Sequence, residues 1–553
     1  MAELLLGPIL RHVEHDEATI WLETDEACEV RILDYVASTF QVEGHHYALV
    51  GITGLEAGAS YEYTVELDGE RVWPDHHSDL PPSVLRTLSA DRGEVRLAFG
   101  SCRVSRPHQP PHVLTGREHP DGHGIDALRA LALRLASSSS ASWPHCLLML
   151  GDQIYADELS PSMLELTRDR REPDGVPTDE LADFDEYALA YREAWSEPVI
   201  RWLLANVPVA MIFDDHEIEA QWKTSQAWVE EMRAKPWYER HVVAGLMAYW
   251  VYQHLGNLSL AELAENDIFR RLHGEDDAGE LLREQMANAD RQPGHSRWSF
   301  SRDLGRARLV AIDTRAGREL EPGRRRIIDD GEWEWVTERA TGDFEHLLLA
   351  SSVPFVLPPA LHYAETWVEA IADGAWGTQA ARAAEWVRRK GVMDQWASFR
   401  HSFDRLGALL EEIAGGERGS PPTTVVMLSG DVHHCYLAEI DFQNEAKPES
   451  AVWQCVSSAY RKELEPREKR VMRIANSRSL EIAARTIARL TGTAETRLRW
   501  RLLDRPGYEN QLGTLSLAQG SARIRVETPD GSDWRHPVLR PVFEHELVIG
   551  GET

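Results

Sequence analysis

Two patterns of hydrophobic and polar positions divide this chain of 553 residues. In the first 88 residues, segments such as Ala18-Thr-Ile-Trp-Leu alternate apolar with polar residues, which is the period of a half-buried strand. From about residue 94 to residue 460, short apolar runs such as His346-Leu-Leu-Leu-Ala alternate with longer amphipathic segments. The first pattern predicts a small β-sandwich over residues 1–88, and the second predicts a layered α/β domain over residues 94–460.

The first domain carries one local signature. Its segment Leu55-Glu-Ala-Gly-Ala-Ser-Tyr-Glu-Tyr resembles the turn and tyrosine corner of fibronectin type III domains. Pro74, Pro81 and Pro82 mark the linker that ends it. We find no cluster of catalytic residue types here, so packing or docking of a partner is the expected role.

The α/β domain is predicted to contain helices over Ile125 to Leu135 and over Asp179 to Asn206. Residues 223–295 form a long, mostly helical insertion, and such insertions often wall a pocket. The final part, residues 461–553, begins with a basic helical region and closes with a β-hairpin. Between Arg461 and Arg505 the sequence contains thirteen Lys/Arg and six Asp/Glu. A solvated helix face is the default explanation of these charges, and guidance of an anionic substrate is the alternative.

The charge of the whole chain narrows the class of protein. Lys and Arg number 59 against 90 Asp and Glu, which gives a net charge of −31. Such a surface repels phosphate backbones and anionic lipid heads, which argues against a nucleic-acid binder or a peripheral membrane protein. An anionic substrate must therefore be attracted by a local positive feature, and bound metal ions are the obvious candidate.

Cysteine usage and hydropathy bear on location. The five cysteines are few and widely spread, so they indicate no disulfide framework. The N-terminus lacks a basic stretch followed by an apolar segment, so no signal peptide is expected. No apolar run approaches the about 20 residues that span a bilayer. These features predict a cytoplasmic protein without a membrane span.

Polar side chains follow four of the apolar strands at the point where each strand ends. They are Cys102, Asp152, Tyr155, Asp214, Asp215, His216, Asp431 and His433. Open α/β sheets bind ligands at the carboxyl ends of their strands, so these residues can converge. Carboxylates suit hard cations, imidazole suits iron or zinc, and thiolate and phenolate favour an ion such as ferric iron. The mixture indicates two unlike metals, which at about 3.5–4 Å apart can stabilise a transferring phosphoryl group.

Four motifs built on these residues carry a family resemblance. Phe99-Gly-Ser-Cys102, Gly151-Asp-Gln-Ile-Tyr-Ala-Asp157, Asp214-Asp-His-Glu217 and Ser429-Gly-Asp-Val-His433 resemble the ordered motifs of the PhoD-like branch of the calcineurin-type metallophosphoesterases. Ile312-Asp-Thr-Arg315 and Asp394-Gln-Trp396 fit the same family. The resemblance implies an α/β fold: a metallophosphoesterase β-sandwich flanked by helices, preceded by a fibronectin-III-like or Ig-like β-sandwich domain.

The resemblance also implies roles for the residues. Cys102, Asp152, Tyr155 and His433 match the ligands of a ferric ion (Fe3+), and Asp152 bridges to a second ion helped by Asp431. That second ion is Ca2+ or another divalent metal. Asp215 stands where the wider superfamily places an asparagine ligand. His216 and Asp431 are the residues expected to act in catalysis, with His216 assisting the leaving oxygen.

The chain departs from the family pattern at three positions. Glu158 stands where the best-known members have a phosphate-gripping arginine, and Ala220 and Gln221 replace asparagines that often follow the third motif. The substrate-binding residue and the second metal therefore stay open. Arg103, Arg106, Arg315 or the basic C-terminal region are candidates for the substrate contact.

The predicted function is hydrolysis of a small-molecule phosphate ester by a metal-bound hydroxide. One alternative is a phosphodiesterase or phospholipase D-like enzyme with the same metals. Another is a non-catalytic family member that binds metal. The individual residues have simpler roles too: Cys102 can be a buried apolar residue, and Tyr155 can cap a core. The oligomeric state is not predicted.

Overall fold

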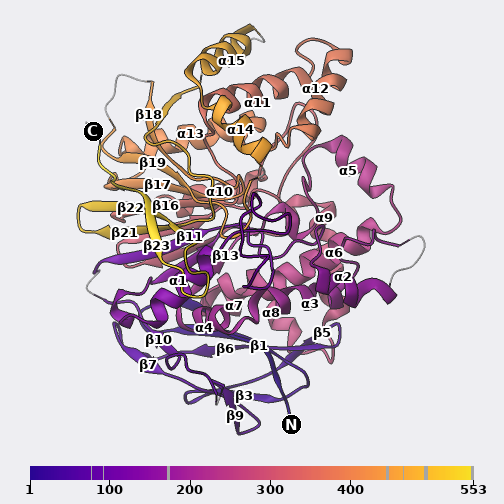
Figure 1. Ribbon diagram of the computed structural model, residues 1–553, viewed down its shortest axis with the longest axis vertical. Helices are drawn as coiled ribbons and strands as arrows, with labels where there is room; N and C mark the ends of the chain where they lie inside the picture. Colours follow the sequence, from indigo (N-terminus) through magenta and orange to yellow (C-terminus); the bar gives the residue numbers. More distant parts are fainter. Residues whose placement is uncertain are drawn as a thin grey trace.

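The computed structural model describes residues 1–75, 77–90, 93–170, 175–443, 448–464, 466–490 and 496–549. An N-terminal β-sandwich lies at one end, a larger two-sheet sandwich occupies the middle, and helices cover the outer faces and the opposite end (Figure 1). Within these described ranges, every helix is too short or too polar to cross a bilayer.

The N-terminal sandwich is built from two four-stranded sheets with the orders β1-β2-β6-β5 and β4-β3-β8-β9, together with the pair β7 and β10. The strands are β1 (Leu4–Val13), β2 (Ala18–Thr24), β3 (Glu29–Ile32), β4 (Tyr35–Ser38), β5 (Phe40–Val42), β6 (His45–Ile52), β7 (Ser60–Glu62), β8 (Val65–Leu67), β9 (Glu70–Trp73) and β10 (Val84–Arg86). Inward residues such as Ile20 and Val65 form its core. At the predicted corner, the Glu56 N–H donates to Tyr61 Oη at 2.7 Å.

The central sandwich consists of a six-stranded sheet, β13-β12-β11-β21-β22-β23, and a seven-stranded sheet, β14-β15-β16-β17-β19-β18-β20. The strands are β11 (Val95–Gly100), β12 (Cys146–Met149), β13 (Val209–Met211), β14 (Phe300–Leu304), β15 (Ala307–Ala311), β16 (His346–Ser351), β17 (Thr424–Ser429), β18 (Tyr436–Phe442), β19 (Ala451–Val456), β20 (Leu498–Leu502), β21 (Leu512–Ala518), β22 (Ser521–Pro529) and β23 (Leu539–Glu546). Strands β11 to β13 run parallel, as do β15, β16, β17 and β19.

Burial on both faces explains why these strands read as continuous apolar runs. Leu148 and Val426 belong to the core between the two sheets. Their neighbours Leu147 and Val425 point the other way, into the core beneath the helices. A strand covered on both faces has no place for a polar side chain until it ends. The polar residues therefore concentrate at the strand ends.

The helices are α1 (Ala127–Ala136), α2 (Pro161–Thr167), α3 (Phe184–Trp195), α4 (Pro198–Asn206), α5 (Gln226–Arg233), α6 (Tyr238–Tyr249), α7 (Leu260–Glu265), α8 (Asp267–Leu272), α9 (Gly279–Arg291), α10 (Asp330–Arg339), α11 (Pro359–Ala372), α12 (Thr378–Lys390), α13 (Arg400–Ala414), α14 (Pro466–Ala475) and α15 (Arg478–Leu490). The insertion over residues 223–295 contains α5 to α9. The single helix predicted over Asp179 to Asn206 is wrong: it is two helices. Pro198 occupies the first turn of α4 and Glu197 caps it, because proline cannot donate the bond that would continue α3.

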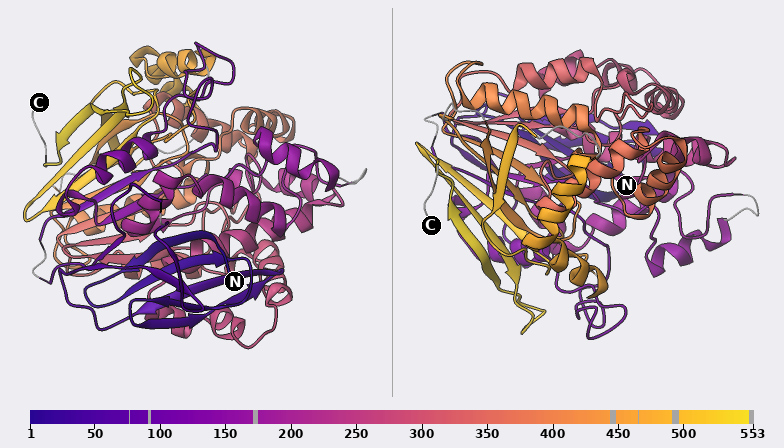
Figure 2. Two further views of the ribbon diagram at one scale, coloured as in Figure 1. Left: turned by 60° about the horizontal axis from the view of Figure 1, so that its bottom comes forward. Right: turned by 90° about the horizontal axis from the view of Figure 1, so that it is seen from above.

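The C-terminal segment completes both sheets of the central sandwich (Figure 2). Strand β20 pairs with β18 in the seven-stranded sheet, and β21 pairs antiparallel with β11 in the six-stranded sheet. Residues 461–553, which the sequence sets apart as a final part with basic helices and a hairpin, thus contribute strands to both sheets of this sandwich.

Candidate metal centre and active site

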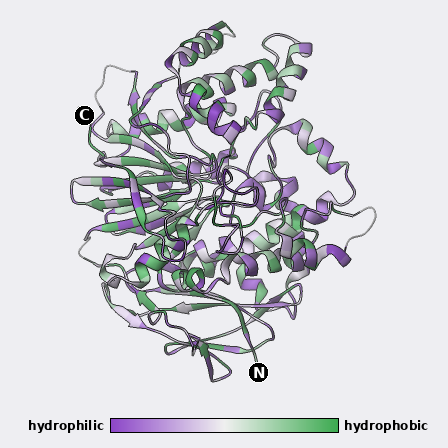
Figure 3. Ribbon diagram, in the orientation of Figure 1, coloured by the Kyte–Doolittle hydropathy of each residue, from purple (hydrophilic) through white to green (hydrophobic). Residues whose placement is uncertain are grey.

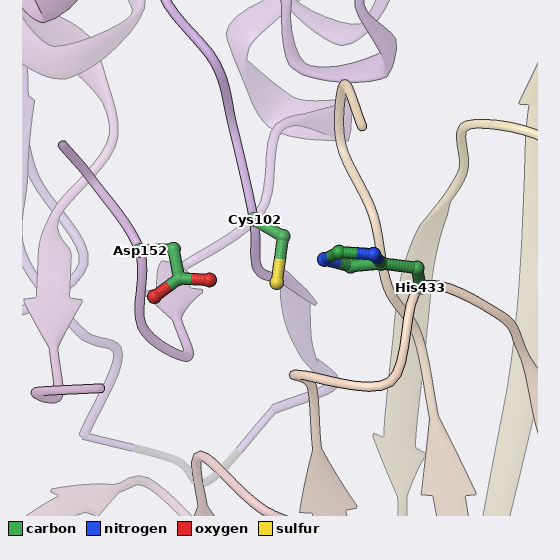
Figure 4. Close-up of side chains that lie close together, drawn as sticks. All are labelled: Cys102, Asp152 and His433. Carbon is green, nitrogen blue, oxygen red and sulfur yellow. The ribbon is translucent and has the colours of Figure 1, made fainter. Parts of the chain in front are cut away.

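The parallel strands bring the predicted site residues to one edge of the central sandwich. Cys102 follows β11, Asp152 and Tyr155 follow β12, and a short helix over Asp215–Glu217 follows β13. From the facing sheet, His433 follows β17. Because parallel strands end on the same side, each sheet delivers its strand ends to this edge. Figure 4 shows Asp152, Cys102 and His433 pointing toward one another.

The first group of candidate ligands is compact. The sulfur of Cys102, a carboxylate oxygen of Asp152 and a ring nitrogen of His433 all lie within 4.8 Å of one another. Tyr155 Oη donates to Asp152 Oδ2 at 3.2 Å. Three of the four residues that the sequence predicts for one ion thus converge, and Tyr155 joins them through its bond to Asp152. Thiolate, phenolate, imidazole and carboxylate together fit a ferric ion.

A second group shares Asp152 with the first. Carboxylate oxygens of Asp152, Asp214 and Asp215 lie within 4.8 Å of one another, and all three residues are buried. Among the described residues, Asp152 Oδ1 and Asp214 Oδ2 lack a hydrogen-bond partner, and Asp215 Oδ1 has an ion-pair contact with Arg315 but no hydrogen bond. A buried polar atom without a partner is costly, and a cation between these oxygens would supply one. The donor set therefore fits two neighbouring cations, the second of them hard.

Asp431 borders both groups but is a member of neither: its backbone oxygen accepts from Cys102 Sγ at 3.6 Å. Its Oδ2 accepts from Gln395 Nε2 at 2.7 Å, and its Oδ1 accepts from Arg315 Nη2 at 3.4 Å. Asp214 caps the short helix over Asp215–Glu217. The same residue also joins the second group. Asp214 is therefore a further candidate ligand of the second ion, and the part of Asp431 in holding that ion stays a prediction.

Arg315 is the centre of a buried ion-pair network. Its guanidinium bonds Asp214 at 2.5 Å and also bonds Asp394, and it lies 3.3 Å from Asp215 Oδ1. Arg318 bonds Asp394 at 3.2 Å. Since Arg315 is fully buried among carboxylates, it positions them and is not a free group for phosphate. The sequence marks both Asp394 and Arg315, in Asp394-Gln-Trp396 and Ile312-Asp-Thr-Arg315, but not that they pair.

A second positioning contact holds His216. Its Nδ1 bonds Asp157 Oδ1 at 2.7 Å, and its ring centroid lies 4.7 Å from that of Tyr155. The Ala220 N–H donates to Asp157 at 2.7 Å. Asp157 was missed as a functional residue, although it closes the second motif. It fixes the orientation of the imidazole and leaves Nε2 as the nitrogen that can serve a substrate.

The backbone at the site is strained. Cys102, Asp152, Asp431 and His433 have φ angles of 55°, 46°, 64° and 50°, in the left-handed region that costs a non-glycine residue about 1–3 kcal/mol. Such strain clusters at functional sites, because surrounding contacts must enforce it. Gly151 permits the close approach of β12 and β13: a Cβ there would lie 2.5 Å from Asp214 Cβ.

Crowded carboxylates perturb the pKa values of the site. Burial, with repulsion from Asp215, raises the pKa of Asp431 to about 7 despite Arg315. Burial and the charges of Asp431 and Asp152 also raise the pKa of Asp214 well above its usual range, although Arg315 opposes this. Burial alone would lower the pKa of His216, but Asp157 outweighs it and raises that pKa to about 10. The pocket holds more negative charge than its arginines neutralise, as a cation site requires.

Lys462 lies beside the site; it belongs to the basic C-terminal region that the sequence offers for the substrate contact, but no pattern singles it out there. Its Nζ sits 3.8 Å from the centroid of the Tyr155 ring and 2.7 Å from Glu158 Oε2. Two of the arginines that the sequence offers for the substrate contact lie in other surroundings than Lys462. Arg103 is buried and bonds Asp126 at 2.7 Å, whereas Arg106 lines a small pocket next to Tyr155. Because Glu158 and Lys462 are 304 residues apart, no local pattern could pair them.

Comparisons with known proteins bear on the family. The model of the PhoD-like phosphatase family matches residues 134–511, which include the motifs around Asp152, His216 and His433 but not Cys102. A second model, a domain family of unknown function (DUF7800), matches residues 1–85. A search of curated proteins found no match.

Among solved structures, one titled "Structure of PhoD" is 13% identical, and the match covers 99% of this chain and 94% of that chain with a TM-score of 0.58. It shares the fold. A maltogenic amylase from S. marinus is 9% identical over 94% of this chain and 76% of its own. Its TM-score of 0.17 is too low to indicate a shared fold. The family model spans more than half of the 553 residues, and this chain belongs to the PhoD-like phosphatase family.

Proposed function

We propose that this protein hydrolyses phosphate esters at the edge of its central sandwich with two cations. Cys102, Asp152, Tyr155 and His433 would hold an Fe3+ ion. Asp152, Asp214 and Asp215 would hold a divalent ion, for which Ca2+ is the first candidate. The observation that carries this proposal is the position of Asp152, which belongs to both ligand groups and has a buried oxygen without a described partner.

The chemistry divides between the ions and the chain. Two adjacent cations lower the pKa of a bound water and neutralise phosphoryl oxygens. His216 is held by Asp157 through Nδ1, so Nε2 would give its proton to the departing ester oxygen. Asp431 remains the second catalytic residue of the proposal. Its bonds to Gln395 and Arg315 support a role in positioning the pocket around the second ion.

We assign the phosphate contact to Lys462. Its ammonium stands over the Tyr155 ring, and its bond to Glu158 holds it there. A cation placed beside ligand-bearing residues can meet a phosphoryl oxygen. The site would therefore have a positive group even though Glu158 stands where relatives have arginine. The Glu158 carboxylate bonds Lys462 and so orients a cation from a distant part of the chain.

The central experiment measures metal content and turnover together. In Asp152→Asn, both ions lose their shared ligand, so we expect iron and divalent metal to fall and turnover of p-nitrophenyl phosphate to drop at least ~1000-fold. Circular dichroism would report an unchanged fold. Glu17→Gln is the matched control, since Glu17 belongs to a cluster with His12 and Glu14 in the N-terminal sandwich. Full turnover by Asp152→Asn would refute the proposed site.

Two further measurements refine it. Comparing p-nitrophenyl phosphate with bis-p-nitrophenyl phosphate separates a phosphatase from a phosphodiesterase. In Lys462→Ala, the ratio kcat/KM should fall about 10–100-fold with metal content unchanged. Lys469→Ala is the control, because Lys469 pairs with Glu463 at 3.0 Å. Equal kinetics of the two lysine variants would exclude Lys462 from substrate binding.

A further inference from the structure

Exposed hydrophobic side chains gather at one end of the molecule. Among the described residues, seventeen large hydrophobic side chains are exposed, and ten of them lie within residues 376–392 and 471–490. Leu490, Trp386 and Val471 are 74%, 63% and 62% exposed. Helices α12 and α15 both pack on α11, at the end of the molecule opposite the N-terminal sandwich (Figure 1). A concentration of this kind marks an interaction site.

Helix α15 packs with its small residues and leaves its large ones outside. Ala488 is buried, and the Arg485 guanidinium lies 5.8 Å from the ring of Tyr363 on α11. Leu480, Ile487 and Leu490, spaced seven and three residues apart on the same helix, are exposed. An amphipathic helix normally buries its large aliphatic face against the core. Here that face is available to a partner.

The same surface is basic. Residues 376–392 and 471–490 carry eight Lys/Arg and two Asp/Glu, whereas the whole chain carries 59 and 90. Even when Glu231, which pairs with Arg389 at 2.8 Å, is counted with them, the excess is positive. Figure 3 shows hydrophilic and hydrophobic residues side by side along these helices. Charges beyond about 10 Å are screened at 0.1 M salt, so the local charge decides what approaches this end.

We propose that this end of the protein, formed by α12, α14 and α15, docks on an anionic lipid bilayer. Exposed aliphatic residues next to arginines are the pattern of helices that lie in the bilayer interface, and tryptophans such as Trp386 favour that interface. A second copy of this chain is disfavoured, because two surfaces with the same positive excess would face each other. The net charge of −31 argues against membrane contact for the chain as a whole. At this end, however, Lys and Arg outnumber Asp and Glu, and the distant acidic residues are screened by salt. The inference does not depend on the proposed hydrolysis.

The test is flotation of the full chain with vesicles. We expect binding to vesicles of phosphatidylcholine with about 30% phosphatidylserine, weakened by added salt, and little binding to phosphatidylcholine alone. The triple variant Leu480→Ser, Ile487→Ser and Leu490→Ser should bind at least ~ten-fold more weakly. Arg382→Glu with Lys390→Glu should also weaken binding to anionic vesicles. Each variant should keep full turnover of a soluble ester, since none lies in the site.

The matched control is Leu164→Ser with Leu166→Ser, because these exposed residues lie on α2, outside the proposed surface. That control should bind as well as the unmodified protein. Absence of vesicle binding, equal binding to neutral vesicles, or unchanged binding by the triple variant would overturn the proposal. If light scattering shows a dimer for the unmodified protein and a monomer for the triple variant, the surface binds a second copy of this chain instead of a bilayer.

Discussion

The protein contains two β-sandwiches that differ in what stands at their strand ends. In the N-terminal sandwich, the neighbouring strands pair antiparallel, and tight turns such as the one at Gly44 connect several of them. In the central sandwich, parallel strands end at Cys102, Asp152 and Asp431 in strained left-handed backbone. Antiparallel hairpins scatter strand ends over two edges, whereas parallel strands collect them on one. Strand direction, more than residue content, thus decides which sandwich can assemble a metal centre.

The largest effect is expected from the buried charges of the central sandwich. Arg315→Gln removes the partner of Asp214 and Asp394, so it should lower the free energy of unfolding by about 3–5 kcal/mol. Arg31→Gln in the N-terminal sandwich removes an exposed pair with Glu29 and should cost less than about 1 kcal/mol. Urea unfolding of both variants gives the comparison. Equal losses would mean that the carboxylates around Arg315 do not need its charge.

A smaller effect separates two glycines with positive φ. Gly151→Ala, at φ 108°, pushes a Cβ against Asp214, so it should lose about 1–3 kcal/mol and about 100-fold in turnover through displacement of that carboxylate. Gly44 has φ 82° and, among the described residues, open space around its Cα. Gly44→Ala should cost about 1 kcal/mol and leave turnover intact. Normal kinetics in Gly151→Ala would show that the position of Asp214 is unimportant.

The smallest effect concerns pH. Burial lowers the pKa of His362, on α11, to about 3, against about 6.5 in an unfolded chain. Below pH 6.5, His362 is therefore protonated in the unfolded chain, whereas in the folded protein it stays neutral down to about pH 3. The free energy of unfolding consequently falls as the pH decreases through this window. Lowering the pH from 7.5 to 5.5 should cost about 1.4 kcal/mol from this residue.

His362→Phe keeps an aromatic ring beside Phe403 and Trp500 and should remove that part of the pH dependence. Unfolding curves at both pH values measure it, with His46→Phe in the N-terminal sandwich as the control. A variant whose pH dependence matches that of the unmodified protein would place the proton uptake elsewhere.

How far the sequence predicts the site depends on the distance along the chain over which each residue is positioned. Asp152, Tyr155 and His433 could be predicted, because each follows an apolar strand directly and buried strands tolerate charge only at their ends. The break between α3 and α4 at Pro198 was missed, although proline ends a helix by a local mechanism. The place of Asp214 within the second group, and that of Asp431 next to it, depend on how two sheets face each other.

The sequence alone determined the α/β class, the buried strands and the types of ligand at their ends, because hydrophobic period and strand termination are local properties of the chain. The tertiary structure decided which carboxylate oxygens lack a partner, that Arg315 is enclosed by acids, and that Lys462 stands over Tyr155. It also decided that α15 turns its aliphatic residues outward. These features arise from contacts between residues as far apart as Tyr155 and Lys462, which are separated by 307 positions, and such contacts follow from the packing of whole sheets and helices.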